Sequence, residues 1–120
     1  DVEMMKKEKK IKVVIVEPNQ LPRMETINNN LETFQKLVGG YIEVVRSNEF
    51  IDMIINEEGK LIGLEPNFGL RNGDVIVGTA IFASHKGEEF ASLPDDWDEF
   101  IHKKFTETRL RKHGQTNRTD

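Results

Sequence analysis

The polar side chains of this sequence that are most able to carry chemistry lie at predicted strand ends and in the adjoining loops. Five of them lie in such loops, namely Glu17, Asn19, Asn56, Asn67 and Arg71. Loop residues held by a rigid sheet often form binding sites, so we predict that these five converge on a small ligand-binding pocket at one edge of the sheet. The alternative is that the asparagines only cap turns by bonding to their own backbone.

Catalytic and metal-binding arrangements are not recognisable in the sequence. Cysteine is absent, which removes thiolate nucleophiles, disulfides and cysteine-based zinc sites, and is typical of a reducing compartment. We predict His85 in a hairpin loop as a surface histidine, and Ser84 beside it would point to the opposite face of a strand. His102 and His113 would lie about three turns apart on a helix, too far for a shared metal. We therefore predict a non-enzymatic protein without a metal or a cofactor.

Two other function classes stay open. Loop carboxylates such as Glu17 or Glu57 could serve a small hydrolase or transferase, if a water-excluding pocket raised the pKa of one of them. The basic stretch from Lys103 to Arg118 could contact the phosphates of a nucleic acid. However, residues 1–101 carry 11 Lys and Arg against 19 Asp and Glu, whereas residues 102–120 carry 6 against 2. Since an acidic body disfavours phosphate binding, we interpret the basic stretch as the solvated last turns of a helix.

Hydrophobic spacing predicts the elements that position these residues. Strands are expected at 11–16, 41–45, 50–56, 61–64 and 75–83, with a short apolar return at 90–92, a loop at 65–74 and a hairpin loop at 84–89. A stripe from Met24 to Val38 predicts a helix that ends at Gly39-Gly40. A second helix is expected from a Ser92 cap to Gly114.

Strands that run consecutively between two helices favour the α+β class. We predict a small, mainly antiparallel sheet of five to six strands with two helices packed on it, in the order β-α-β-β-β-β-β-α. The strand–helix–strand opening leaves room for one parallel pair of strands.

The length of 120 residues predicts one domain over residues 11–113. We expect a flexible lead-in or vector remnant at 1–10 and a disordered tail at 114–120. No apolar run approaches the roughly 18 residues of a membrane span, and the charged start is unlike a secretory signal. We therefore expect a cytoplasmic protein with no membrane partner, and an uncovered sheet edge predicts a homodimer.

Several short patterns occur here in an order found in a known family. They include VIVEPN at 14–19, LVGGYIE at 37–43, NEEGKLIGLEPN at 56–67, IVGT at 76–79 and FASL at 90–93. Over about residues 11–101 this order resembles the domain-of-unknown-function family 3846, although Pro94 stands where a capping hydroxyl is expected. The family comprises small proteins of Gram-positive bacteria, their phages and mobile elements, and it brings no catalytic residues to transfer.

The resemblance implies a role only through the kinds of proteins that make up the family. The expectation is a binding protein of phage or mobile-element type that contacts a host protein, another host macromolecule or a small metabolite, and so antagonises a host defence. Nucleic acid is not the expected partner, because the body of the protein is acidic.

Overall fold

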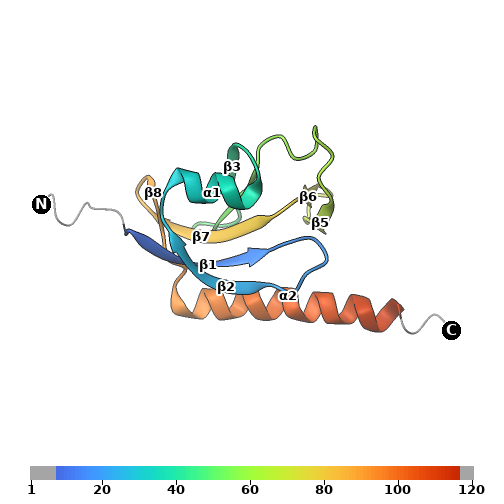
Figure 1. Cartoon of the computed structure of the whole chain (residues 1–120). Coiled ribbons are helices and arrows are strands. Elements are labelled where there is room, and N and C mark those ends of the chain that lie inside the picture. The colour runs from blue at the N-terminus through green and yellow to red at the C-terminus, as the bar shows by residue number, and fades with distance from the viewer. Residues whose placement is uncertain (1–7, 117–120) are drawn as a thin grey trace, which may run out of the picture.

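The central sheet is antiparallel at every pairing in the part of the chain that the computed structural model describes, which is residues 8–116, with side chains up to Arg111. Its spatial order is β2-β1-β7-β4-β3, with β8 added beside β7 (Figure 1). These strands are β1 (Lys10–Val16), β2 (Arg23–Asn28), β3 (Ile42–Arg46), β4 (Asp52–Asn56), β7 (Ala80–Lys86) and β8 (Glu89–Ala91). A separate hairpin holds β5 (Pro66–Gly69) and β6 (Val75–Val77).

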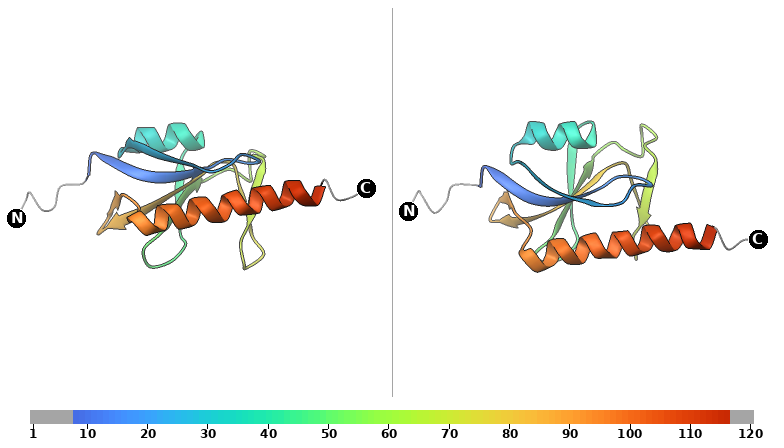
Figure 2. Two further views of the ribbon diagram at one scale, coloured as in Figure 1. Left: turned by 90° about the horizontal axis from the view of Figure 1, so that it is seen from below. Right: turned by 60° about the horizontal axis from the view of Figure 1, so that its bottom comes forward.

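Two helices cover opposite faces of this sheet, α1 (Leu31–Val38) and α2 (Asp95–Thr116) (Figures 1 and 2). Successive residues of a strand point to opposite faces, so β1 supplies two cores. Val13 and Ile15 pack with Phe34 of α1, whereas Val14 packs with Ile101 of α2. The α+β class predicted from the sequence is confirmed. No helix among the described residues combines the length and the apolar character needed to cross a membrane.

The helix predicted from Met24 is wrong in its first half. Residues 23–28 form β2, in which Ile27 lies opposite Ile11 of β1 and is the only buried residue. The helix begins at Leu31, because the side chain of Asn30 accepts a hydrogen bond from the Thr33 N–H and caps it. Its predicted end is confirmed, since Gly39 takes the left-handed conformation with φ 80°.

The middle of the chain also departs from the prediction. Residues 61–64 form no strand, because consecutive turn bonds, including Leu64 N–H to Gly59 carbonyl at 2.9 Å, fold them onto the preceding residues. The predicted loop at 65–74 contains β5. The strand expected at 75–83 is broken at Gly78, which has φ 74°, and its second part continues through His85 to the end of β7. The mainly antiparallel sheet is confirmed, and the parallel pair for which the sequence left room does not occur among the described strands.

The start of α2 is held by β1 rather than by a capping hydroxyl. Ser92 Oγ accepts a hydrogen bond from the Lys12 N–H at 2.9 Å, so it does not cap the helix, and the Pro94 carbonyl accepts the first helical N–H groups. Lys12 Nζ contacts Asp95 at 3.0 Å and Asp98 at 3.2 Å, and these contacts raise its pKa. The helix continues past Gly114, where it was predicted to end.

The two predicted flexible ends lie largely outside the described residues. Of the expected lead-in at 1–10, Lys10 already belongs to β1, and of the expected tail at 114–120, residues 114–116 belong to α2. The side chain of His113 also lies outside the described part of the chain.

Candidate functional site

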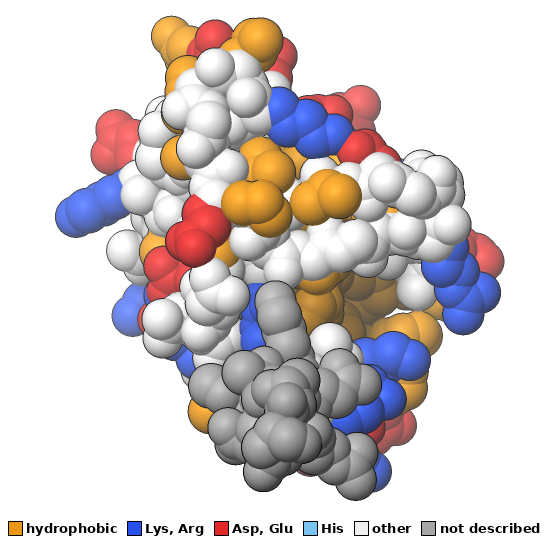
Figure 3. All heavy atoms as spheres, turned by 90° about the vertical axis from the view of Figure 1, so that its right-hand side faces the viewer, with side chains coloured by type: hydrophobic (Ala, Val, Ile, Leu, Met, Phe, Trp, Pro, Cys, Tyr) orange, Lys and Arg blue, Asp and Glu red, His pale blue; other side chains and the backbone are white. Residues whose placement is uncertain are grey.

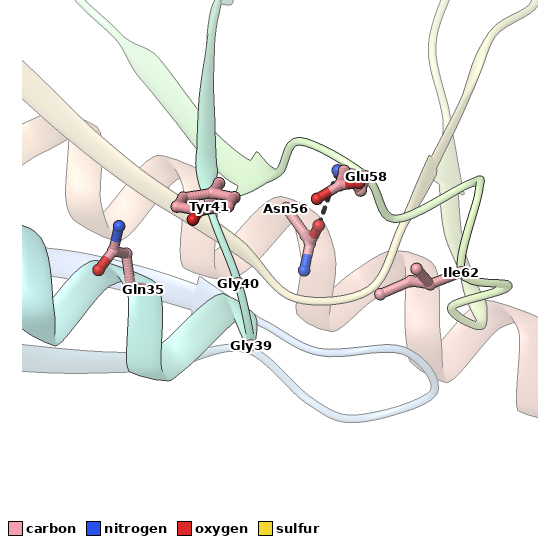
Figure 4. Close-up of a pocket in the computed structure, with 7 residues that line it drawn as sticks. All are labelled: Gln35, Gly39, Gly40, Tyr41, Asn56, Glu58 and Ile62. Carbon is pink, nitrogen blue, oxygen red and sulfur yellow. Dashed lines mark hydrogen bonds between the residues drawn. The ribbon is translucent and has the colours of Figure 1, made fainter.

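A pocket of about 260 Å³ opens where α1 ends and β3 begins (Figure 4). Its rim is apolar and exposed, since Tyr41 is 66% and Ile62 is 58% exposed, and the adjoining Leu61 is 86% exposed. The lining comes from three segments that are distant in sequence, namely the end of α1, the end of β4 and the turn that follows β4. The lining residues are Gln35, Gly39, Gly40, Tyr41, Asn56, Glu58 and Ile62.

The floor of the pocket is rigid because Asn56 ties its walls together. This buried side chain donates from Nδ2 to the Val38 carbonyl at 3.1 Å and accepts at Oδ1 from the Glu58 N–H at 2.8 Å (Figure 4). A Cβ atom at position 40 would lie only 2.9 Å from Asn56 Nδ2, so Gly40 is required for this approach. The residue predicted to bind a ligand therefore holds a pocket in place.

Exposed hydrophobic surface is not confined to the pocket rim. The end of the molecule that carries β5 and β6 shows further hydrophobic side chains in separate patches, with Lys and Arg side chains at their margins (Figure 3). Single exposed apolar side chains are normal on a protein surface. The rim differs from them because its exposed side chains adjoin a depression with a fixed floor.

Apart from the pocket, a cluster of charged side chains joins β3, β4 and β7. Asp52 is 1% exposed, and its Oδ2 lies 2.9 Å from His85 Nδ1. The other carboxylate oxygen has no hydrogen-bond partner among the described residues, although Arg46 Nε lies 3.4 Å from it. That contact is electrostatic, because its geometry is not that of a hydrogen bond.

This cluster corrects the prediction that His85 is a surface histidine in a loop. The β4–β7 register places Asp52 opposite Ala83, and His85 lies two residues further along on the same face of the strand. An imidazole that donates from Nδ1 to a carboxylate leaves Nε2 as an acceptor when it is neutral. The pair can therefore present a basic nitrogen.

Three of the five predicted site residues lie near the end of β1. Arg109 of α2 links two of them, because its guanidinium donates to the carbonyls of Glu17 at 3.1 Å, Asn67 at 3.2 Å and Gln20 at 3.0 Å, and also to Asn67 Oδ1. Asn67 Nδ2 in turn donates to the carbonyls of Val16 at 2.9 Å and Gly78 at 2.7 Å. Asn19 donates to the Glu65 carboxylate at 2.8 Å.

The hydrogen bonds around Arg109 hold α2 to the loop after β1 and to β5; we call them the Arg109 lock, and they leave no open site. Arg109 is only 9% exposed, and burial lowers its pKa from the ordinary arginine value. The prediction of solvated cations in the last turns of the second helix is wrong for this residue, because its side chain reaches back to the loops. The Glu17 carboxylate is also occupied, since it pairs with Arg23.

The other two predicted residues do not join this group. Asn56 lies at the pocket described above, and Arg71 is exposed in the turn between β5 and β6. Glu57, the second carboxylate considered for catalysis, is exposed. No three His, Asp or Glu side chains within the described residues are close enough to hold a metal ion.

Sequence reasoning missed most of the pocket. Tyr41 carried a usable signal, since it is an aromatic residue between a Gly-Gly helix stop and the start of β3 at Ile42. Ile62 carried none, because its exposure depends on turns that replace the predicted strand. Asp52 and His85 could be paired only by knowing the register between β4 and β7.

Comparison with known proteins identifies a family. The sequence model of a family described as "Domain of unknown function (DUF3846)" matches residues 11–106. Neither a curated protein nor a solved structure matches the chain. The match covers most of the 120 residues and agrees with the resemblance noted in the sequence. The chain belongs to the DUF3846 family.

Proposed function

We propose that this protein acts by binding, and that its partner is a host protein that docks over the pocket at the end of α1. The observation that carries the proposal is the apolar rim, where Tyr41, Leu61 and Ile62 are between 58% and 86% exposed beside a fixed depression. Aromatic and aliphatic side chains around a small pocket are typical of the residues that contribute most to protein interfaces.

A small metabolite is the less favoured ligand. The cavity volume of about 260 Å³ lies just below the roughly 300–1,000 Å³ of most small-molecule sites. Small molecules are usually enclosed, whereas the largest side chains here stand on the rim. Antagonism of a host defence by a cytoplasmic protein of a phage or mobile element is part of the proposal. This part of the proposal follows only from what the resemblance to the family implies.

A pull-down with matched variants tests the proposal. Tagged wild-type protein, a Tyr41→Ala/Ile62→Ser variant and a Phe100→Ser control are incubated with a Gram-positive host lysate, and the retained proteins are quantified by mass spectrometry. Phe100 is 55% exposed on α2, on the other face of the sheet. We expect a protein that the wild type and the control retain equally, and that the rim variant retains about 30-fold less, as for the loss of a 2 kcal/mol contact. Equal retention by all three would remove the proposal.

A small hydrolase or transferase is the second candidate, and one observation favours it. The buried Asp52 carboxylate orients His85 so that Nε2 can act as a general base. Activity against a panel of esters and phosphoesters should then fall by about 10²- to 10⁴-fold in His85→Gln. If His85→Gln turns over a substrate as fast as wild type does, that activity comes from a contaminant and not from this site.

We also propose that a second copy pairs along β3. The Glu57 N–H donates to the Tyr41 carbonyl and the Ser47 N–H to the Ile51 carbonyl. Because bonding alternates along an antiparallel strand, the backbone groups of Ile42, Val44 and Arg46 face away from β4. Among the strands of residues 8–116, β3 has no second neighbour. Light scattering should give twice the monomer mass for the wild type. Val44→Pro should give the monomer mass, because proline lacks the N–H that would pair with the second copy. A wild-type monomer at millimolar concentration would refute this pairing.

A further inference from the structure

We propose that the pocket at the end of α1 binds the cationic end of an arginine or lysine side chain of the partner protein. This inference rests on the proposed function and adds the chemistry of the group that enters the pocket. It combines the charge of the lining, the position of the helix end and the shape of the rim.

The pocket lies at the negative end of a helix. The Gln35 carbonyl accepts the N–H groups of both Gly39 and Gly40, at 2.8 and 3.1 Å. Gly39 and Gly40, which follow the last residue of the helix, line the pocket, so the C-terminal end of α1 adjoins it. Free carbonyls at a helix C-terminus carry a partial negative charge that attracts cations.

Among the described residues that line the pocket, Glu58 is the one charged side chain and acts in the same direction, whereas Lys36 in the last turn of α1 opposes it. Glu58 contributes a carboxylate to the lining, and no lysine or arginine lines it. The closest cation after Glu58 in sequence, Lys60, is paired with Asp74. An anionic ligand would be repelled here, and a neutral apolar group would desolvate the carboxylate without a partner.

The rim suits a long cationic side chain. The exposed ring of Tyr41 can take a guanidinium or ammonium against its face. On the opposite side Ile62 can pack against the aliphatic stem (Figure 4). Asn56 Oδ1 already accepts one hydrogen bond and retains a second lone pair for a donor. A planar guanidinium with five donors uses these scattered acceptors better than an ammonium does.

Capped amino acids test this chemistry directly. Wild-type protein labelled with ¹⁵N is titrated with acetyl-Gly-Arg-Gly-amide, the lysine analogue, the norleucine analogue and free agmatine, and amide shifts are followed. We expect saturable shifts at Gly39, Gly40 and Tyr41 with a Kd on the order of 1–10 mM for the arginine peptide. The norleucine peptide should cause none. Binding of agmatine without binding of the peptide would overturn the assignment to a protein side chain.

Two adjacent acids provide the matched control. Both side chains are exposed, but Glu58 lines the pocket and Glu57 does not. Glu58→Gln should weaken arginine-peptide binding at least 3-fold, while Glu57→Gln, with the same change of net charge, should leave it within about 1.5-fold. Equal weakening would mean long-range attraction alone and would refute the site.

The outcome for the pocket is separable from that for the proposed function. If the Tyr41→Ala/Ile62→Ser variant loses a host protein but Glu58→Gln keeps it, docking at the rim stands and the cationic anchor is wrong. If neither variant loses a host protein and the arginine peptide still saturates the pocket, the site stands as a cation site and the proposed docking fails.

Discussion

Replacing Arg109 should be among the most damaging single changes in this protein. The residue is 9% exposed, and its guanidinium donates four hydrogen bonds, three to backbone carbonyls and one to the Asn67 side chain. These acceptors lie in the loop after β1 and in β5, so the side chain fastens α2 to two other segments. Arg109→Ala leaves these acceptors without their donor.

The size of the loss follows from the partners left behind. A hydrogen bond to a charged group contributes about 1.5–3 kcal/mol, so four would give about 6 kcal/mol at the lower bound. Burial of the guanidinium opposes this, and water can reach the loop carbonyls once the side chain is gone. We therefore expect Arg109→Ala to lower the free energy of unfolding by about 3 kcal/mol. Arg109→Lys keeps the positive charge but loses the planar guanidinium with its several donors, and should lower the free energy of unfolding by about 2 kcal/mol.

Urea unfolding followed by far-UV circular dichroism measures this loss. In a thermal unfolding experiment, the melting temperature of Arg109→Ala should be about 12 °C lower than that of wild type, at about 4 °C per kcal/mol for a domain of this size. Lys103→Ala is the control, because Lys103 is exposed on the same helix and should change stability by less than about 0.5 kcal/mol. Combining Arg109→Ala with Asn67→Ala should cost less than the sum of the two, because the residues share one network.

Truncation gives an independent test of the same lock. A protein that ends at Thr108 should be less stable than one that ends at Arg111 by about as much as Arg109→Ala is less stable than wild type. An Arg109→Ala protein within 1 kcal/mol of wild type would refute the reasoning. The buried guanidinium would then contribute no more than a surface charge.

Three further changes have defined outcomes. Asn56→Ala removes both ties across the pocket floor and should cost about 2 kcal/mol in urea unfolding. Gly78→Ala should cost about 2 kcal/mol by the same assay, because the residue has φ 74° and its Cβ would lie 2.7 Å from Leu64 Cδ1. The Lys60 ion pair and a backbone N–H lower the pKa of Asp74 below its ordinary 3.8, so its contribution is present above about pH 4 and is lost as pH falls through the lower folded value. Asp74→Asn should flatten the stability profile below pH 4, and an unchanged profile would contradict this assignment.

Local signals were sufficient where one face of an element decides its structure. The stripe that ends at Val38 and the stop at Gly39 gave the end of α1 correctly, since a helix end depends on its own residues. Residues 23–28 were mistaken for helix because Met24 and Ile27 satisfy helical spacing. Their actual structure depends on pairing with β1, which is a tertiary effect.

The candidate sites depend still more on distant contacts. Asn56 was singled out as a polar residue at a strand end, and it does line a pocket. Its neighbours there come from the end of α1 and from the turn after β4, and no spacing along the chain predicts that approach. The partners of Arg109 lie 42 to 92 positions away, so a buried guanidinium could not be told from a solvated one.

The placement of α2 has a consequence for how the nascent chain folds. The hairpin of β1 and β2 is synthesised before α2, so the face that carries Val14 and Val16 stays open to water until α2 has followed. Contacts separated by 80 to 92 residues then close that face. Such a high contact order slows folding, so translation must pass Arg109 before the domain can become resistant to proteases.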